Sequence, residues 1–161
     1  MLRKRIYAMS ATMAVAAALS TGTAIAEPSA TGPTKDKKHC VYNVDTKVAR
    51  CYATLAEAHA PGADGSPSAR GTLTASGSAY LAFMYDANGA SLTLTNTNGC
   101  SQKSAENIPG WWNDRMTSVD SYCYMTFYQN AWQGGAGWGV VPGPNYAPNW
   151  FYAVASSYKV L

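Results

Sequence analysis

The chain has 161 residues, of which 12 are Lys or Arg, 9 are Asp or Glu and 2 are His. Three of the basic residues, Arg3, Lys4 and Arg5, stand at the N-terminus, and the rest of the chain carries nine residues of each sign. A net charge near zero, without a basic patch in a folded segment, excludes nucleic acid as the main partner, because such binding depends on clustered Lys and Arg.

Residues 1–26 are predicted to be a signal peptide. The basic start is followed by a mostly apolar run at residues 6–19 and by a small-x-small cleavage motif at residues 24–26. A membrane anchor needs about 20 apolar residues, and this run is shorter. We therefore expect cleavage before Glu27, secretion to the extracellular space, and no membrane association after cleavage.

The cysteines are expected to be oxidised. All four, Cys40, Cys51, Cys100 and Cys123, lie in the exported part of the chain. An even number of cysteines in an oxidising compartment predicts two disulfides. Four cysteines allow three pairings, and closure between sequence neighbours favours Cys40–Cys51 and Cys100–Cys123, each worth roughly 3 kcal/mol in the chain-entropy picture. A zinc site is the alternative, but the sequence has no CxxC pair to favour it.

The first part of the exported chain is predicted to hold a small module between two irregular segments. Residues 27–38 have the composition of a flexible tail, and residues 61–76 that of a linker. Residues 39–60 are predicted to form a disulfide-clamped hairpin and a short helix, which begins with the capping-box pattern Thr54-Leu55-Ala56-Glu57. Such a module is too small for its own core. His59 has no partner of matching type nearby, so we interpret it as a solvated helix residue.

Residues 77–161 are predicted to form a larger domain that contains a repeat. Thr117-Ser118 recurs further along as Ser156-Ser157, and Trp and Asn residues precede both pairs. Self-similarity at a period of roughly 40 residues indicates one structural unit used twice. The alternation in Leu92-Thr93-Leu94-Thr95 indicates strands. We therefore predict an all-β fold in which two four-stranded Greek keys pack as a sandwich.

Two motifs in this domain resemble the signatures of the βγ-crystallin family. Asn113-Asp114-x-x-Thr117-Ser118 is similar to the family's calcium-binding pattern, and Phe127-x4-Trp132-x-Gly134 is similar to the aromatic pattern of its folded hairpin. The resemblance covers residues 79–161 and implies a βγ-crystallin-type sandwich. The superfamily also includes secreted metalloprotease inhibitors and killer-toxin-like proteins, so the resemblance implies a fold more firmly than an activity.

The chain departs from the family pattern in both halves. The first half, FMYDANGASLTL, lacks the aromatic spacing of the hairpin signature. The second half has Tyr152 and Ala153 where the calcium pattern requires acidic or amide residues. Of the two calcium sites that the family usually builds, one is therefore expected to be lost.

The remaining motif is a candidate site for one calcium ion. The family's pattern implies ligands from the Asp114 carboxylate, the Arg115 carbonyl and the Thr117 hydroxyl, with Gln129 supplying a carbonyl from the facing hairpin. With one formal negative charge, we expect a dissociation constant of about 10⁻⁴–10⁻³ M. The alternative is a structural turn that is capped by its own Asx and hydroxyl side chains.

The five tryptophans suggest a second kind of site. Exposed indole rings bind sugar rings or partner proteins, and exposed apolar patches mark binding sites. We expect Trp111, Trp132 and Trp150 to lie in the core, because large aromatic residues at signature positions dominate core packing. Trp112 and Trp138 are then the expected exposed pair of a carbohydrate- or protein-binding surface.

Catalysis is the function with the least support. The sequence has no GxSxG, HExxH or paired-carboxylate pattern. We expect a non-enzymatic, monomeric, secreted protein that binds calcium weakly. The alternatives are an inhibitor of extracellular proteases, above all metalloproteases, which would present the loop at residues 101–109 or 134–148, and a killer-toxin-like antimicrobial protein.

Overall fold

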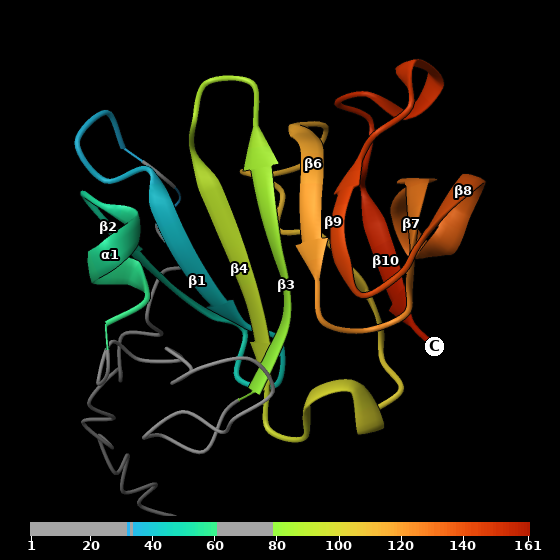
Figure 1. Ribbon diagram of the computed structural model, residues 1–161, viewed down its shortest axis with the longest axis horizontal. Coiled ribbons are helices and arrows are strands. Elements are labelled where there is room, and N and C mark those ends of the chain that lie inside the picture. The colour runs from blue at the N-terminus through green and yellow to red at the C-terminus, as the bar shows by residue number, and fades with distance from the viewer. Residues whose placement is uncertain (1–31, 33, 61–78) are drawn as a thin grey trace, which may run out of the picture.

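The computed structural model describes residues 32, 34–60 and 79–161 (Figure 1). The predicted signal peptide at residues 1–26 and the predicted linker at residues 61–76 lie outside the described residues, as does part of the predicted tail. The described chain forms two β-sheets with short helical turns between the strands. No helix in this part of the chain is long and apolar enough to cross a membrane.

The two sheets have six and four strands. The strand order is β2-β1-β4-β3-β6-β9 in the larger sheet and β5-β10-β7-β8 in the smaller one. Neighbouring strands are antiparallel except for β1 and β4, which are parallel. The strands are β1 (His39–Asn43), β2 (Val48–Tyr52), β3 (Ala79–Asp86), β4 (Ser91–Asn96), β5 (Ala105–Asn107), β6 (Met116–Ser121), β7 (Met125–Asn130), β8 (Gly134–Val140), β9 (Gly143–Tyr146) and β10 (Ser157–Val160). The helical turns are α1 (Leu55–Ala58), η1 (Gly99–Ser101), η2 (Ala131–Gln133) and η3 (Asn149–Phe151).

The two halves of the domain share one topology and exchange one strand. The first half consists of β3 to β6 and the second of β7 to β10. In each half the first strand lies between the second and the fourth and pairs with both, whereas the third strand joins the other half's sheet: β5 pairs with β10, and β9 with β6. The predicted fold class is therefore confirmed, an all-β sandwich of two four-stranded Greek keys preceded by a disulfide-clamped hairpin and a short helix.

The sequence repeat also appears in the hydrogen bonds between the halves. The Ile108 N–H donates to the Ser156 carbonyl at 2.9 Å. Its counterpart in the second half is Ala147, which follows Ile108 in the chain by the same number of residues as Ser156 follows Thr117. The Ala147 N–H donates to the Thr117 carbonyl at 3.1 Å. Residues related by this repeat offset therefore occupy equivalent places in the two Greek keys.

The core between the sheets contains one large aromatic residue from each equivalent turn. Trp112 and Phe151 are both fully buried, and the N–H of each donates to the carbonyl of the proline three positions earlier, at 2.7 and 2.8 Å. The same tight turn therefore directs both rings inward. Burial of each large apolar side chain contributes roughly 1.5–3 kcal/mol. The other large, fully buried side chains include Leu81, Met84, Leu92, Leu94, Met116, Met125, Phe127 and Tyr158.

The predicted exposure of the tryptophans is largely wrong. Trp112 was expected at the surface but is fully buried, and Trp138 is partly buried, with its ring centroid 5.6 Å from that of Phe151. Trp132 and Trp150 were expected in the core but are exposed. The reason is local backbone geometry: the turn before β6 fixes which of two adjacent indoles enters the core, and a left-handed backbone at Trp132 carries that residue outside the hairpin.

The N-terminal hairpin extends the larger sheet. Cys40 and Cys51 lie directly opposite each other on β1 and β2 and form a disulfide, and Cys100 and Cys123 form the second. β1 continues the sheet by parallel pairing with β4. The division into a module at residues 39–60 and a domain at residues 77–161 stays a prediction, but the hairpin has become part of the domain's sheet.

α1 follows the hairpin and begins at the predicted capping box. The Glu57 N–H donates to Thr54 Oγ1, and the Thr54 N–H donates to Glu57 Oε2, both at 3.1 Å. His59, at the end of α1, was expected to be solvated, and this is wrong. Its ring lies 4.5 Å from that of Phe83, and its Nε2 is 3.3 Å from Thr93 Oγ1. Because these partners lie on β3 and β4, the His59 contacts hold the end of α1 against the larger sheet.

Candidate functional site

The calcium-like motif, residues 113–118, covers the end of the turn between β5 and β6 and the first residues of β6. The N–H groups of Trp112 and Asn113 both donate to the Pro109 carbonyl, at 2.7 and 3.1 Å, which tightens the turn. Asp114 then adopts a left-handed backbone, with φ of 57°. Asp and Asn visit this region more readily than other non-glycine residues. The turn therefore presents Asp114 at the surface in a fixed backbone conformation.

The Asp114 carboxylate is exposed and has two polar neighbours. Oδ2 accepts a hydrogen bond from Asn113 Nδ2 at 2.8 Å, and Oδ1 accepts one from Ser156 Oγ at 3.2 Å. Ser156 belongs to the second Greek key, where it is the equivalent of Thr117. The carboxylate of the first half thus lies beside the hydroxyl of the second half.

The Arg115 side chain binds a partner outside the turn. Its guanidinium forms a 2.5 Å ion pair with Asp86 at the end of β3 and lies 4.8 Å from the Trp112 ring centroid. Burial raises the pKa of Asp86, but hydrogen bonds from Arg115 and from the N–H groups of Ala90 and Asn88 outweigh it and hold the pKa below its usual value. Since Asp86 engages the one cation of the turn, the negative charge of Asp114 is left for other partners.

The side chains of Thr117 and Gln129 form hydrogen bonds to groups other than Asp114. Thr117 Oγ1 donates to the Tyr85 carbonyl at 3.2 Å, on the neighbouring strand of its own half. Gln129 Nε2 donates to the Trp150 carbonyl at 3.3 Å, and Gln129 Oε1 accepts from the Ala136 N–H at the same distance. The hydroxyl that contacts Asp114 is that of Ser156, which sequence reasoning did not select. The signal was present, because the repeat already paired Ser156 with Thr117.

The equivalent turn of the second half has the same backbone but other side chains. Ala153 has φ of 55°, and its N–H donates to the Met116 carbonyl at 3.0 Å; in the same way the Asp114 N–H donates to the Ala155 carbonyl at 3.0 Å. Ala153 offers no side-chain oxygen at the place of Asp114. Within residues 34–60 and 79–161, no group of three or more His, Cys, Asp or Glu side chains is arranged to hold a metal ion. Any cation at the first turn would therefore rely on one carboxylate together with hydroxyl and carbonyl oxygens.

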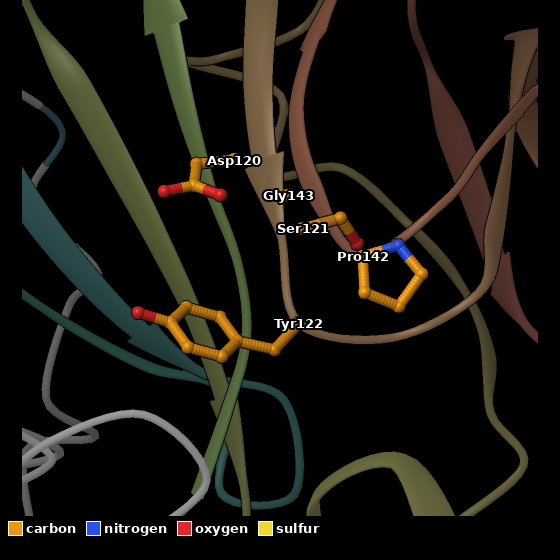
Figure 2. A pocket seen from close by; sticks show the side chains of 5 residues that line it. All are labelled: Asp120, Ser121, Tyr122, Pro142 and Gly143. Carbon is orange, nitrogen blue, oxygen red and sulfur yellow. The ribbon is translucent and has the colours of Figure 1, made fainter.

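A separate shallow pocket lies at the other end of β6. It is lined by Asp120, Ser121, Tyr122, Pro142 and Gly143, and its volume of about 190 Å³ is below the roughly 300–1,000 Å³ of ligand pockets. Figure 2 shows the side chains of Asp120 and Tyr122 on one side of β6 and those of Ser121 and Pro142 on the other. The pocket combines one carboxylate with one phenol and does not include Asp114.

The two segments proposed as inhibitory loops contain strands. Residues 101–109 include β5, and residues 134–148 include β8 and β9. Both segments are therefore part of the sandwich, because β5 and β9 are the exchanged strands. The residues of these two segments that lie outside strands therefore form only short loops.

Three solved structures are similar to the chain. A βγ-crystallin domain from Clostridium beijerinckii and a point mutant of such a domain both share 22% identity with it, with TM-scores of 0.38 and 0.39, over 49% of this chain and 94% of each domain. A double mutant of clostrillin in complex with nickel shares 23% identity, with a TM-score of 0.38, over 50% of this chain and 94% of that one. A scan of protein-family models gives no match, and neither does a search of curated proteins.

Proposed function

We propose that the chain is a secreted, non-enzymatic βγ-crystallin-like domain that binds one calcium ion weakly at the turn of residues 113–118. The observation that carries this proposal is the position of the Asp114 carboxylate. It is exposed, held by a left-handed backbone and next to the Ser156 hydroxyl, while the Arg115 guanidinium is paired with Asp86. Calcium prefers such hard oxygen donors in flexible geometry.

The contacts of Asp114 refine the expected ligand set. Ser156 is favoured over Thr117 as the hydroxyl ligand, because its Oγ already lies 3.2 Å from Asp114 Oδ1. The carbonyls of Arg115 and Gln129 stay proposed ligands, with water completing the shell. One carboxylate gives a dissociation constant of about 10⁻⁴–10⁻³ M, typical of extracellular modules.

Calorimetric titration and thermal melting test the calcium site. At 10 mM calcium, binding of this strength stabilises the folded protein by about 1.4–2.7 kcal/mol over the protein in chelator, a rise in melting temperature of roughly 5 °C or more. Asp114→Asn is expected to abolish the rise and Ser156→Ala to reduce it, whereas Thr117→Val and the control Asp120→Asn should retain it. A wild-type protein with neither heat of binding nor a melting shift would remove the calcium proposal.

Secretion is supported by the predicted signal peptide and by the two disulfides, which persist in oxidising compartments. N-terminal sequencing of protein recovered from the culture medium of an exporting host tests this. A mature chain that begins at Glu27 is the expected result, and a chain retained in the cytoplasm with intact residues 1–26 would contradict it.

A further inference from the structure

The second Greek key contains a long run without charge. No Asp, Glu, Lys, Arg or His occurs from position 121 to position 158, a segment that includes β7, β8, β9 and the start of β10. No side chain of this segment can act as a counter-ion to an anionic or cationic ligand. What the segment can bind depends on its aromatic and amide groups.

Four aromatic side chains of this half are exposed. Their exposed fractions are 75% for Trp132, 82% for Tyr146, 55% for Trp150 and 50% for Tyr152. We call these four residues the aromatic end. Exposed apolar side chains that gather in one part of a surface mark binding sites.

The first Greek key provides an internal comparison for three of these residues. By the repeat offset, Tyr146 corresponds to Asn107, Tyr152 to Asn113 and Trp150 to Trp111. Asn107, Asn113 and Trp111 are only partly exposed. Two amides of the first half are thus replaced by exposed phenol rings in the second, and the tryptophan common to both halves is more exposed in the second. The shared fold does not require these aromatic residues at the surface.

Trp132 is held outside the sandwich by a constrained backbone. Trp132 and Gln133 have φ of 56° and 60°, a left-handed conformation that large L-residues rarely adopt. Both N–H groups are anchored across the sheet, Trp132 to Asn107 Oδ1 at 2.7 Å and Gln133 to Ser157 Oγ at 2.9 Å. An unfavourable conformation fixed in this way at the surface points to a function. Here its effect is an exposed indole on a backbone that hydrogen bonds hold in place.

The aromatic end lies at one end of the sandwich. Trp132 follows the end of β7, and Trp150 is joined to β7 by the hydrogen bond from Gln129 Nε2 to its carbonyl, at 3.3 Å. Tyr146 pairs with Ser118 near the start of β6, at the same end. In Figure 1 the connections β7–β8 and β9–β10 both lie at the upper right, opposite the connection between β6 and β7.

We propose that the aromatic end binds a neutral polysaccharide. Planar aromatic rings stack on the apolar faces of sugar rings, and the nearby amides of Asn130 and Asn149 can bond to hydroxyl groups. A protein interface would be expected to combine Trp and Tyr with Arg at its energetic centre, and residues 121–158 contain no Arg. An anionic polymer would need the cations that this segment lacks. The proposal does not require calcium, although the Asp114 carboxylate lies at the same end of the sandwich, beside Ser156.

Retention on insoluble polysaccharides tests the proposal. The full secreted protein is incubated in chelator with cellulose, chitin, β-1,3-glucan, mannan and, as an anionic comparison, polygalacturonate gel, at 0.1 and 1 M NaCl. We expect retention on at least one neutral polymer that 1 M salt does not reduce. The chelator keeps the result separate from that of the calcium experiment.

Variants locate the surface. Trp132→Ala and Trp150→Ala are expected to weaken retention at least tenfold, with melting temperatures close to that of the wild type. The control Tyr124→Ala removes an aromatic residue that is 60% exposed just before β7, at the opposite end of that strand, and should bind as the wild type does. Lack of retention on every neutral polymer, salt-sensitive retention on polygalacturonate alone, or equal retention by all variants would overturn the proposal. So would self-association or protease binding that depends on Trp132 in place of polysaccharide binding.

Discussion

Asp86 is a buried carboxylate that is neutralised by one cation. It sits at the end of β3, only 7% exposed, and accepts hydrogen bonds from Arg115 and from the N–H groups of Asn88 and Ala90. Its pKa is lowered from the usual 3.8, because these bonds outweigh the effect of burial. A depressed carboxyl pKa stabilises the fold at a pH above that usual value, and this stability is lost as the pH falls through the folded-state pKa.

Asp86→Asn tests this contribution. At neutral pH the variant leaves the Arg115 guanidinium without a carboxylate partner and should lose about 2–4 kcal/mol of unfolding free energy. Below the usual pKa of 3.8 the difference from the wild type should shrink, because the unfolded wild type then takes up a proton at Asp86 more readily than the folded protein does. Denaturant unfolding at pH 7 and pH 3 measures both values. The control Asp120→Asn should change stability little, and an equal loss in both variants would contradict the role of Asp86.

Trp112 and Trp150 differ in burial although both belong to the same repeated turn. Trp112→Ala removes a fully buried indole and should destabilise the protein by about 3–5 kcal/mol. Trp150→Ala removes an exposed ring and should change the unfolding free energy by about 0.5 kcal/mol or less. Urea unfolding of the two variants tests this. A larger loss of unfolding free energy in Trp150→Ala than in Trp112→Ala would contradict the burial of Trp112.

The tryptophans also show which features of single residues could not be predicted from the sequence. The motif positions indicated that aromatic residues matter in each half, but not which ring of an adjacent pair faces inward. That choice depends on the hydrogen bond from the Trp112 N–H to the Pro109 carbonyl. Likewise, the sequence shows that Asp114 is the one carboxylate of the motif, but its contact with Ser156 depends on the packing of the two halves.

At the scale of elements, α1 is attached to the larger sheet through a titratable residue. Burial, and next the charge of nearby His39, lower the pKa of His59 from its usual 6.5. A neutral His59 suits its contacts with Phe83 and Thr93. Because the folded-state pKa is lowered, this stability is fully present above pH 6.5 and is lost as the pH falls through the lowered value.

The pH dependence of melting tests the attachment of α1. The wild type should lose stability as the pH is lowered from 7.5 to 5, and His59→Gln should show a flatter profile over the same range. The pH dependence of melting that remains in the variant is assigned to His39. The pKa of His39 is also lowered, first by burial and then by the charge of Lys38. An unchanged profile in His59→Gln would show that His59 is not the group involved.

The hairpin and helix before the linker illustrate what the sequence predicted about elements. The capping box gave the start of α1, and local closure gave the disulfide between Cys40 and Cys51. The parallel pairing of β1 with β4 was not predictable, because it joins segments far apart in the chain and leaves no periodic signal. His59 was misjudged for the same reason, since its partners lie on strands that come later in the chain.

At the scale of the whole molecule, the two Greek keys form a single unit because each completes the other's sheet. The recurrence of Thr117-Ser118 at Ser156-Ser157 predicted two similar halves, and the hydrogen bonds reproduce the same offset at Ile108 and Ala147. The exchange of β5 and β9 could not be predicted, because such short strands carry little alternation and either sheet could accept them. That exchange brings Ser156 of one half to Asp114 of the other.

A calcium titration followed by two-dimensional ¹H–¹⁵N NMR tests the central claim most directly, which is that one ion binds where the two halves meet. We predict saturable shifts at both residues 113–118 and residues 153–157, with a dissociation constant of about 10⁻⁴–10⁻³ M, and their loss in Asp114→Asn. Shifts confined to the first turn, or scattered over other acidic residues such as Asp45 and Glu106, would contradict it.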